Sequence, residues 1–264
     1  MESPRIKIGI FLQVRLNSSR LSRKALLPLI DGNVIQHAMR ALRTVPADVY
    51  AILTDEQSSQ ELKKYAKQED FEVFIGPQEN VLSRYCLAAE YFNVLRIVRA
   101  TGDNPLVSPM LTKLILLLHH KKQAELSHFI GMPLGTGVEI IETKSLKKTL
   151  SIVKDPFEKE HLTTHFYRNR DKFKIIEDAC PIKCYLPEAR VSLDTKEDYE
   201  LIKLIFSDLY KQKPIETDRI VTWFKKEKIY NFNEGKIENK NITNSGFKKG
   251  IGFRPFNKMP ISFE

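Results

Sequence analysis

The fold is decided by "IKIGIFLQV", residues 6–14, and by "RLNSSRLSRK", residues 15–24, which follows without a break. After Lys7 the first stretch is a near-continuous apolar run, which is typical of a strand buried on both faces, as in a parallel sheet. The second stretch carries four cations, and no Asp or Glu occurs between residues 3 and 30. Such a loop is either a solvated basic surface or an anion site, because cations, hydroxyls and backbone N–H groups all bind phosphate oxygens. It matches neither of the common glycine-rich nucleotide motifs.

Strand and helix patterns alternate along the first 130 residues. Further strands are predicted over 48–54, 71–76, 94–101 and 126–131, and helices over 33–44, 58–69, 79–92 and 109–123. This alternation predicts an α/β fold with a doubly wound, mostly parallel sheet. Ligands of such sheets bind beyond the carboxyl ends of the strands. The basic loop and the segment "TGDNP", residues 101–105, both follow a predicted strand at that edge.

Beyond residue 130 the pattern becomes less regular, which suggests a small accessory region. "GMPLGTGVEII", residues 131–141, is typical of a loop that enters a strand. Two more strands are predicted over 172–178 and 190–194, and helices over 143–153, 155–169, 196–210 and 217–228. Periodicity fades from about residue 231. We therefore expect one main domain over 1–212 and a helical and extended basic tail over 213–264.

Composition narrows the class of protein. The chain has 264 residues and a net charge of +9, but residues 211–264 hold twelve Lys and Arg against six Asp and Glu. Aromatic residues in this tail leave binding of an anionic polymer open, yet no recognition motif accompanies the charge, so no nucleic-acid partner is expected. No apolar run is long enough to span a membrane, and the start of the chain is not a secretory signal. Three sparse cysteines indicate a reducing compartment, so we expect a cytoplasmic protein.

Two aspartates are candidates for a metal site. Asp103 in "TGDNP" and Asp194 at the end of "RVSLD" each follow a predicted strand. Either one alone is usually a turn or capping residue. Together they could bind Mg²⁺, which proteins hold through one or two carboxylates plus substrate phosphates. A zinc site is a weaker alternative, either at His161 and His165 of "EKEHLTTH", which lacks the order of the zinc-protease motif, or at Cys180 and Cys184.

Over about residues 6–210 the chain resembles the cytidylyltransferase-like family typified by spore-coat polysaccharide biosynthesis protein F, a relative of CMP-KDO and CMP-sialic acid synthetases. Six segments carry the resemblance in the same order: "IFLQVRLNSSRLSRKALLPL", "EDFEVFIGPQENVLSRYCLAA", "VRATGDNPLVSP", "GVEII", "DPFEKEHLTTHFYRN" and "RVSLDTKEDYEL". The resemblance implies a fold like that of the nucleotide-diphosphosugar transferases, with residues 1–212 as the nucleotidyltransferase domain. A homodimer is plausible by analogy.

The resemblance also assigns residues. The family's loop Q-x-R-x-x-S-x-R-L-P-x-K, which wraps a triphosphate, is matched by Gln13, Arg15, Ser18, Arg20, Leu21 and Lys24. Ser22 and Arg23 stand where the family has Pro and commonly Gly, so the loop is expected to be less preorganised. The metal motifs are intact at Asp103 and Asp194. Two further departures are Asn80, which replaces an acid ahead of the retained Arg84, and Gly137, which replaces an acid ahead of the retained Glu139.

The implied activity is Mg²⁺-dependent transfer of CMP from CTP to a sugar or sugar-acid-like acceptor, with release of pyrophosphate, in surface polysaccharide or glycoconjugate biosynthesis. The implied catalytic residues are Arg15, Lys24 and Asp103, and the metal ligands are Asp103 and Asp194. The implied nucleotide-binding residues are Leu12, Gln13, Val14, Arg15, Ser18, Arg20, Lys24, Ser83, Arg84 and Asp103. The acceptor-side candidates are Glu139, Glu160, His161 and Arg190.

Two alternatives stay open. One is a glycosyltransferase of the same fold, which would use a nucleotide sugar. Such enzymes usually carry a D-x-D pair, whereas Asp103 stands alone in "GDN", and this favours nucleotidyl transfer. The other is a catalytically silent binding homologue, which the departures at Ser22, Asn80 and Gly137 would permit. The surviving metal acids and loop cations favour an active enzyme, because they are the groups that the chemistry needs.

Overall fold

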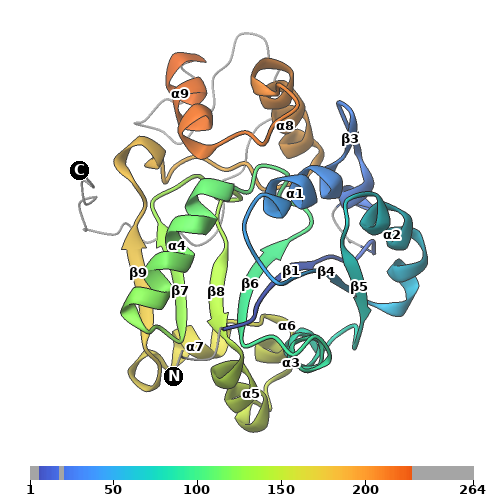
Figure 1. Cartoon of the computed structure of the whole chain (residues 1–264). Helices are drawn as coiled ribbons and strands as arrows, with labels where there is room; N and C mark the ends of the chain where they lie inside the picture. Colours follow the sequence, from blue (N-terminus) through green and yellow to red (C-terminus); the bar gives the residue numbers. More distant parts are fainter. Residues whose placement is uncertain (1–5, 18–20, 228–264) are drawn as a thin grey trace.

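The computed structural model of the chain describes residues 6–17 and 21–227. Its centre is a seven-stranded sheet in the order β5-β4-β1-β6-β8-β7-β9 (Figure 1). Only the pairs that β8 makes with β6 and β7 are antiparallel, so the prediction of a mostly parallel sheet is confirmed. The strands are β1 Ile8–Gln13, β4 Val49–Thr54, β5 Glu72–Ile75, β6 Arg96–Thr101, β7 Leu126–Ile130, β8 Glu139–Glu142 and β9 Ile175–Ala179.

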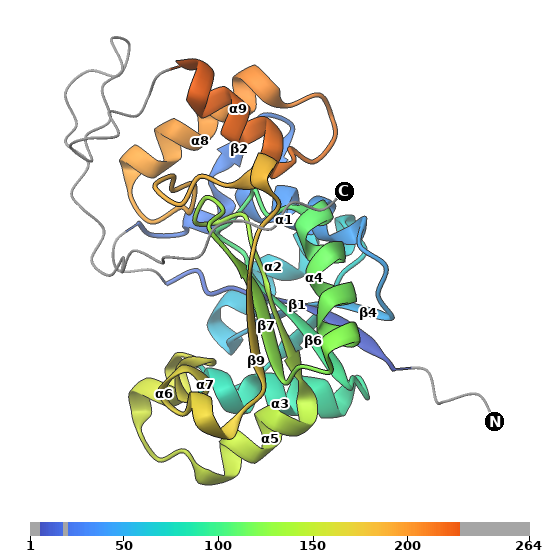
Figure 2. The same ribbon diagram turned by 90° about the vertical axis from the view of Figure 1, so that its left-hand side faces the viewer.

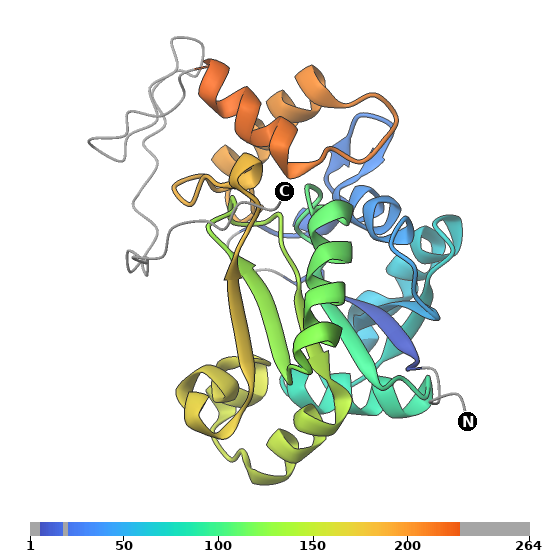
Figure 3. The same cartoon turned by 60° about the vertical axis from the view of Figure 1, so that its left-hand side comes forward.

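Helices cover both faces of the sheet, and the side chains of β1 alternate between the two cores. Ile10 and Leu12 lie in the core beneath α1, α2 and α4, whereas Phe11 lies in the core beneath α3, α5 and α7. Burial on both faces explains the near-continuous apolar run of β1. In Figure 3, α4 lies along the strands that include β7 and β8. These helices are α1 Val34–Arg43, α2 Glu56–Gln68, α3 Val81–Tyr91, α4 Pro109–Lys122, α5 Thr143–Ile152, α6 Pro156–Glu160 and α7 Thr164–Arg168.

A third apolar cluster joins the end of the described chain to its beginning. Helices α8 (Lys196–Leu209) and α9 (Thr217–Glu227) lie together at one end of the sheet, near the hairpin of β2 (Pro28–Leu29) and β3 (Gly32–Asn33) (Figures 1 and 2). Phe224 of α9 is buried in the same cluster as Leu29. Helix α9 therefore packs on the main body, and the rest of the expected tail, 228–264, lies outside the described residues.

Two local expectations were wrong. Residues 155–169 form two short helices, α6 and α7, because His161 leaves the helical conformation at the end of α6. Residues 190–194 form no strand, and Arg190 makes only an isolated bridge to Leu134. The backbone N–H groups of this segment bond two loops instead: Val191 donates to the Leu134 carbonyl and Leu193 to the Asp103 carbonyl. Short 3₁₀ turns occur at η1 Lys24–Leu26, η2 Arg170–Lys172 and η3 Ile182–Cys184.

Candidate active site

The carboxyl ends of the central parallel strands meet at one edge of the sheet. Gln13, the last residue of β1, pairs in register with Leu53 of β4 and Thr101 of β6. The loops that follow β1 and β6 are therefore neighbours, and the Gly102 N–H donates to the Gln13 carbonyl. This is the edge at which open α/β sheets bind ligands.

Three of the predicted residues converge at this edge. The Nζ of Lys24 lies 2.5 Å from Asp103 Oδ2 and 2.8 Å from Asp194 Oδ1. The same ammonium group donates to the Leu193 carbonyl over 2.7 Å. The ammonium therefore donates hydrogen bonds to Leu193 and Asp194 and forms an ion pair with Asp103. Arg190 pairs with the other carboxylate oxygen of Asp194, which places that acceptor-side candidate beside the metal candidates.

Asp194 is held in place by the start of α8. The Oδ2 of Asp198 accepts hydrogen bonds from the N–H groups of Asp194 and Thr195, at 2.8 and 2.9 Å. The Thr195 side chain in turn accepts from the Asp198 N–H, which completes a capping box. The last acid of the "LDTKED" segment therefore positions the first. Sequence reasoning used this segment only for Asp194 and did not identify the orienting role of Asp198.

Lys24 is presented by a strained residue. Arg23 has φ 56° and ψ 25°, the left-handed region, immediately before η1. A non-glycine residue there costs about 1–2 kcal/mol, which explains why glycine is common at this position in the family. The side chain of Arg23 pairs with Glu61 of α2. Arg23 therefore turns toward α2, away from the carboxylates that Lys24 contacts.

The start of the basic loop is anchored on α2. The Leu16 N–H donates to Ser58 Oγ over 3.0 Å, and that hydroxyl donates to Asp55 Oδ2 over 3.1 Å. Asn17 donates to Gln57 over 2.8 Å. Ser58 and Asp55 are buried and were not among the predicted site residues. The sequence predicts a helix from residue 58 capped by one of its serines, but α2 begins at Glu56 and Asp55 is its N-cap.

Arg15 connects the basic loop to the acceptor-side candidates. Its Nη2 lies 3.4 Å from Glu160 Oε1, and both side chains are about half exposed. His161 follows at the end of α6, with its ring stacked at a tilt on Phe157. The structure thus brings Arg15, Glu160 and His161 to one place. The predicted residues Ser18 and Arg20 lie outside the described residues.

The three residues at the end of β1 contribute differently from one another. The side chains of Leu12 and Val14 are buried in the core, and the Val14 N–H donates to the Leu53 carbonyl. Gln13 has a buried Oε1 without a hydrogen-bond partner among the described residues. Buried polar groups normally have partners, so an orphaned acceptor at a ligand-binding edge is a candidate contact for a bound substrate.

The Asn80 departure preserves the local structure. Its side chain accepts from the Ser83 N–H over 2.9 Å and so caps α3, as an aspartate would. Arg84 is buried, and its guanidinium donates to the carbonyls of Pro77 and Gln78 at 2.7 to 3.0 Å. Burial lowers the pKa of Arg84. The observed role of Arg84 is to hold the loop between β5 and α3.

Glu139 lies in a buried ionic network. It pairs with Arg99 across the β6–β8 ladder and accepts from the Tyr167 hydroxyl over 2.7 Å. Burial alone would raise the pKa of Glu139, but Arg99, the His128 charge and the Tyr167 hydrogen bond together outweigh it and lower that pKa. The Nε of Arg99 is buried without a partner among the described residues. Glu139 therefore has two partners within the chain, and Arg99 is a site residue that was not predicted.

His128 extends this network. Its Nε2 lies 3.0 Å from Glu177 Oε1 and its Nδ1 lies 3.1 Å from the Phe129 carbonyl. Both neighbours only accept hydrogen bonds, so the doubly protonated ring satisfies both. Burial works to lower the pKa of His128, but the bond to Glu177 and the charges of Glu139 and Glu177 together outweigh it, and that pKa is raised. The same bond lowers the pKa of Glu177 to about 2.

Gly137 leaves room that a methionine fills. A Cβ atom at Gly137 would come within 2.0 Å of the Met132 methyl group. Met132 packs at the border of the main apolar cluster. Where the resemblance predicts an acid, this chain thus places a thioether, and the surroundings of Glu139 have one carboxylate fewer.

The donor set at Asp103 and Asp194 suits magnesium. Two carboxylates and the Leu193 carbonyl already surround one cation, the Lys24 ammonium, and hard oxygen ligands are those that Mg²⁺ prefers. The zinc alternatives fare worse: no group of three or more His, Cys, Asp and Glu suited to a metal occurs in the described part of the chain. Cys180 and Cys184 are buried, and burial raises their pKa values to about 12 and 11.

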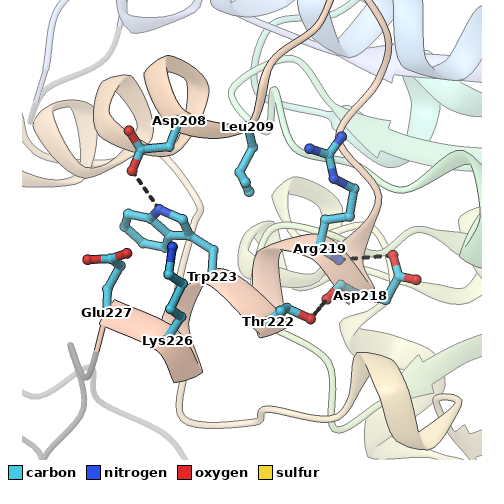
Figure 4. A pocket seen from close by; sticks show the side chains of 8 residues that line it. All are labelled: Asp208, Leu209, Asp218, Arg219, Thr222, Trp223, Lys226 and Glu227. Carbon is cyan, nitrogen blue, oxygen red and sulfur yellow. Dashed lines mark hydrogen bonds between the residues drawn. The ribbon is translucent and has the colours of Figure 1, made fainter.

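Two measured surface hollows lie elsewhere. One, of about 530 Å³, opens between α8 and α9, where the Trp223 indole donates to Asp208 (Figure 4). The other, of about 850 Å³, borders the edge strand β5. Neither hollow is lined by a predicted site residue. The candidate site is instead defined by the side chains that converge at the strand ends. Among the helices of residues 6–17 and 21–227, none has the length and apolarity to cross a bilayer.

Comparison with known proteins agrees with this fold. A family model described as cytidylyltransferase matches residues 10–244. The spore coat polysaccharide biosynthesis protein SpsF of Bacillus subtilis strain 168 is 27% identical over 223 residues, which cover 81% of this chain and 92% of that protein. The structure of a cytidylyltransferase from Leptospira borgpetersenii is similar with a TM-score of 0.80 and 29% identity, covering 84% of this chain and 95% of that one. The synthetase for CMP:2-keto-3-deoxy-manno-octonic acid, complexed with CTP, has a TM-score of 0.61 and 14% identity over 76% of this chain and 99% of its own, a likeness of fold alone.

Proposed function

Because this chain belongs to the cytidylyltransferase family, we propose that it transfers CMP from CTP to a sugar or sugar-acid-like acceptor, releases pyrophosphate, and depends on Mg²⁺. The relative from Bacillus supports a place in polysaccharide biosynthesis, and the neighbour complexed with CTP supports the choice of nucleotide. The observation that carries the proposal is the convergence of Asp103, Asp194 and Lys24 at the strand ends.

The chain's own residues divide the work. Asp103 and Asp194 would hold Mg²⁺, which when bound would neutralise charge at the α-phosphate and acidify the acceptor hydroxyl. Arg15, Arg20 and Lys24 would donate to the phosphates and stabilise the leaving pyrophosphate. Positioning and fixed charge supply most of the rate in phosphoryl transfer, so these groups suffice for the chemistry.

The acceptor side is the α6 segment and the buried network beside it. Arg15 contacts Glu160, and His161 follows Glu160 in the chain, so these two residues are the proposed contacts for acceptor hydroxyls next to the phosphate loop. Gln13 Oε1 and Arg99 Nε have no hydrogen-bond partner among the described residues. They are proposed as further contacts for a bound substrate, Gln13 as an acceptor and Arg99 as a donor of hydrogen bonds. Ser83 remains a proposed nucleotide contact, at the first turn of α3.

The test is release of pyrophosphate. The four nucleoside triphosphates are screened with Mg²⁺ against sugar acids, sugar phosphates and polyol phosphates, and CTP with one acceptor class is expected to give turnover. Asp103→Asn should lower turnover at least about 100-fold, the order seen when one charge-stabilising group is lost. Asp70→Asn, an exposed aspartate paired with Arg43, is the control and should behave as wild type. Normal turnover of Asp103→Asn, or release of a nucleoside diphosphate from a nucleotide sugar, would contradict the proposal.

A further inference from the structure

Lys24 sits where two carboxylates would hold a metal. Its ammonium group contacts Asp103 Oδ2 at 2.5 Å and Asp194 Oδ1 at 2.8 Å. Its side chain is 12% exposed, against 29% for Asp103 and 19% for Asp194. The same ammonium group also donates a hydrogen bond to the Leu193 carbonyl. The two carboxylate oxygens that face each other across this site are therefore already engaged by a cation of the chain itself.

We propose that Lys24 is the resident counter-ion of the Asp103–Asp194 pair, and that the nucleotide's triphosphate must draw it away before the pair binds a divalent cation. The inference rests on the proposed function and adds an order to it: metal binds at this pair together with the nucleotide or after it, and binds poorly alone.

The charges of the site support this order. Lys24 faces one oxygen of Asp194 and Arg190 faces the other, so both oxygens of that ligand already contact cations. The negative charge of Asp198 lies beyond, 3.7 Å from Arg190, and is also committed to backbone N–H groups. A free divalent cation would have to displace the ammonium or sit beside it, and like charges in contact repel strongly.

When a triphosphate is present, every charged group that loses a partner in this exchange of cations gains a new one. The ammonium loses two carboxylates and gains phosphate oxygens, while the carboxylates lose one cation and gain another. Lysine suits this movement because it is a compact charge on a flexible stem that can swing while its backbone stays in η1. Linkage then requires that metal and nucleotide raise each other's affinity by the same factor.

The test measures metal binding without turnover. Mn²⁺, a probe for Mg²⁺ with an electron paramagnetic resonance signal, is titrated into the full chain without nucleotide. Wild type should bind it weakly, and Lys24→Met should bind it at least about tenfold more tightly because the carboxylates lose their ammonium. Arg23→Met removes the adjacent cation, which pairs with Glu61, and should match wild type. The double variant Lys24→Met with Asp103→Asn should lose the gain, which locates the ion at the pair.

Equal Mn²⁺ affinity in wild type and Lys24→Met would overturn the inference. If Lys24→Met does not fold, the ¹⁵N resonance of the Lys24 ammonium in the wild-type chain tests the inference instead. CTP in the presence of a chelator should shift this resonance. Mg²⁺ alone at the same concentration should not shift it. A shift by Mg²⁺ alone would also overturn it. Failure of the proposed function is distinguishable, because it appears as absent pyrophosphate release while these binding results stand.

Discussion

Replacing Glu139 by glutamine tests whether this residue holds the fold together or binds the acceptor. Its carboxylate is 16% exposed and pairs with Arg99, which is 23% exposed, inside the network on the α3–α7 face. Glutamine keeps an acceptor for the Tyr167 hydroxyl but removes the charge opposite Arg99. The guanidinium, which is largely shielded from solvent, then loses its carboxylate partner. Burial works to lower the pKa of Arg99, and the Glu139 charge, aided by Tyr85, the Glu139 hydrogen bond and Tyr167, keeps that pKa raised.

The expected loss of stability is large. Breaking one partner of a buried ion pair typically costs about 3–5 kcal/mol. For a domain of this size each kcal/mol shifts the melting temperature by about 2–4 °C, so Glu139→Gln should melt about 6–20 °C lower than wild type. Adding Arg99→Met removes the stranded charge and should recover part of the loss.

Urea unfolding followed by circular dichroism gives the free energy, and thermal melts check it. Glu90→Gln is the matched control, because Glu90 is 71% exposed and pairs with the exposed Lys147. Exposed pairs contribute about 0–1 kcal/mol, so the control should unfold close to wild type. If Glu139→Gln unfolds within about 1 kcal/mol of wild type and its KM for the acceptor rises strongly, the structural role is refuted in favour of direct acceptor binding.

The pH dependence and the basic loop supply the remaining predictions. The pKa of Glu177 is lowered from 4.5 to about 2, so this carboxylate stabilises the fold above about pH 4.5. The pKa of His128 is raised above 6.5, so this imidazole stabilises the fold below pH 6.5. That stabilisation is lost as the pH rises through the raised pKa of His128. Wild type should therefore exceed His128→Gln in unfolding free energy most between these two pH values and less above them; a constant difference from pH 5 to 9 would contradict this. Arg23→Gly relieves the left-handed strain and loses an exposed ion pair, so its melting temperature should change little and its CTP affinity not at all by calorimetry. Arg15→Ala should weaken CTP at least about tenfold, and an equal loss in Arg23→Gly would show that Arg23 does contact phosphate.

The nucleotide side of the site was predictable because it depends on consecutive elements. A buried strand followed by a loop defines where that loop lies, and parallel strands bring their carboxyl ends to one edge. Lys24 and Asp103 were thus placed at the same edge before their contact was known. Asp194 needed more than the pattern: its segment is not a strand as predicted, and it reaches the site through the capping box of Asp198 and the bond from Leu193 to the Asp103 carbonyl.

The proposed acceptor side was less predictable because it depends on β8, which runs antiparallel to its neighbours β6 and β7. Chain order would place β7 beside β6, but β8 inserts between them and brings Glu139 opposite Arg99. A glutamate in one segment and an arginine within an apolar run in another contain no signal of that register. The only sign of the Arg99–Glu139 pair in the sequence is therefore the charge of Arg99 within the predicted strand "VLRIVRAT".

The departures from the family pattern bear on the acceptor more than on loss of activity. Asn80 makes the same cap as the acid it replaces, and Arg23 occupies the glycine conformation with its side chain turned to α2. Neither change removes a charge that the chemistry needs. Gly137 is different, because the space of an acidic side chain is taken by Met132, beside a Glu139 that is already paired. Under the proposed function, an acceptor bound beside Glu139 would meet one carboxylate fewer and a more apolar surface, so a less polar acceptor would explain these departures better than decay of the catalytic site would.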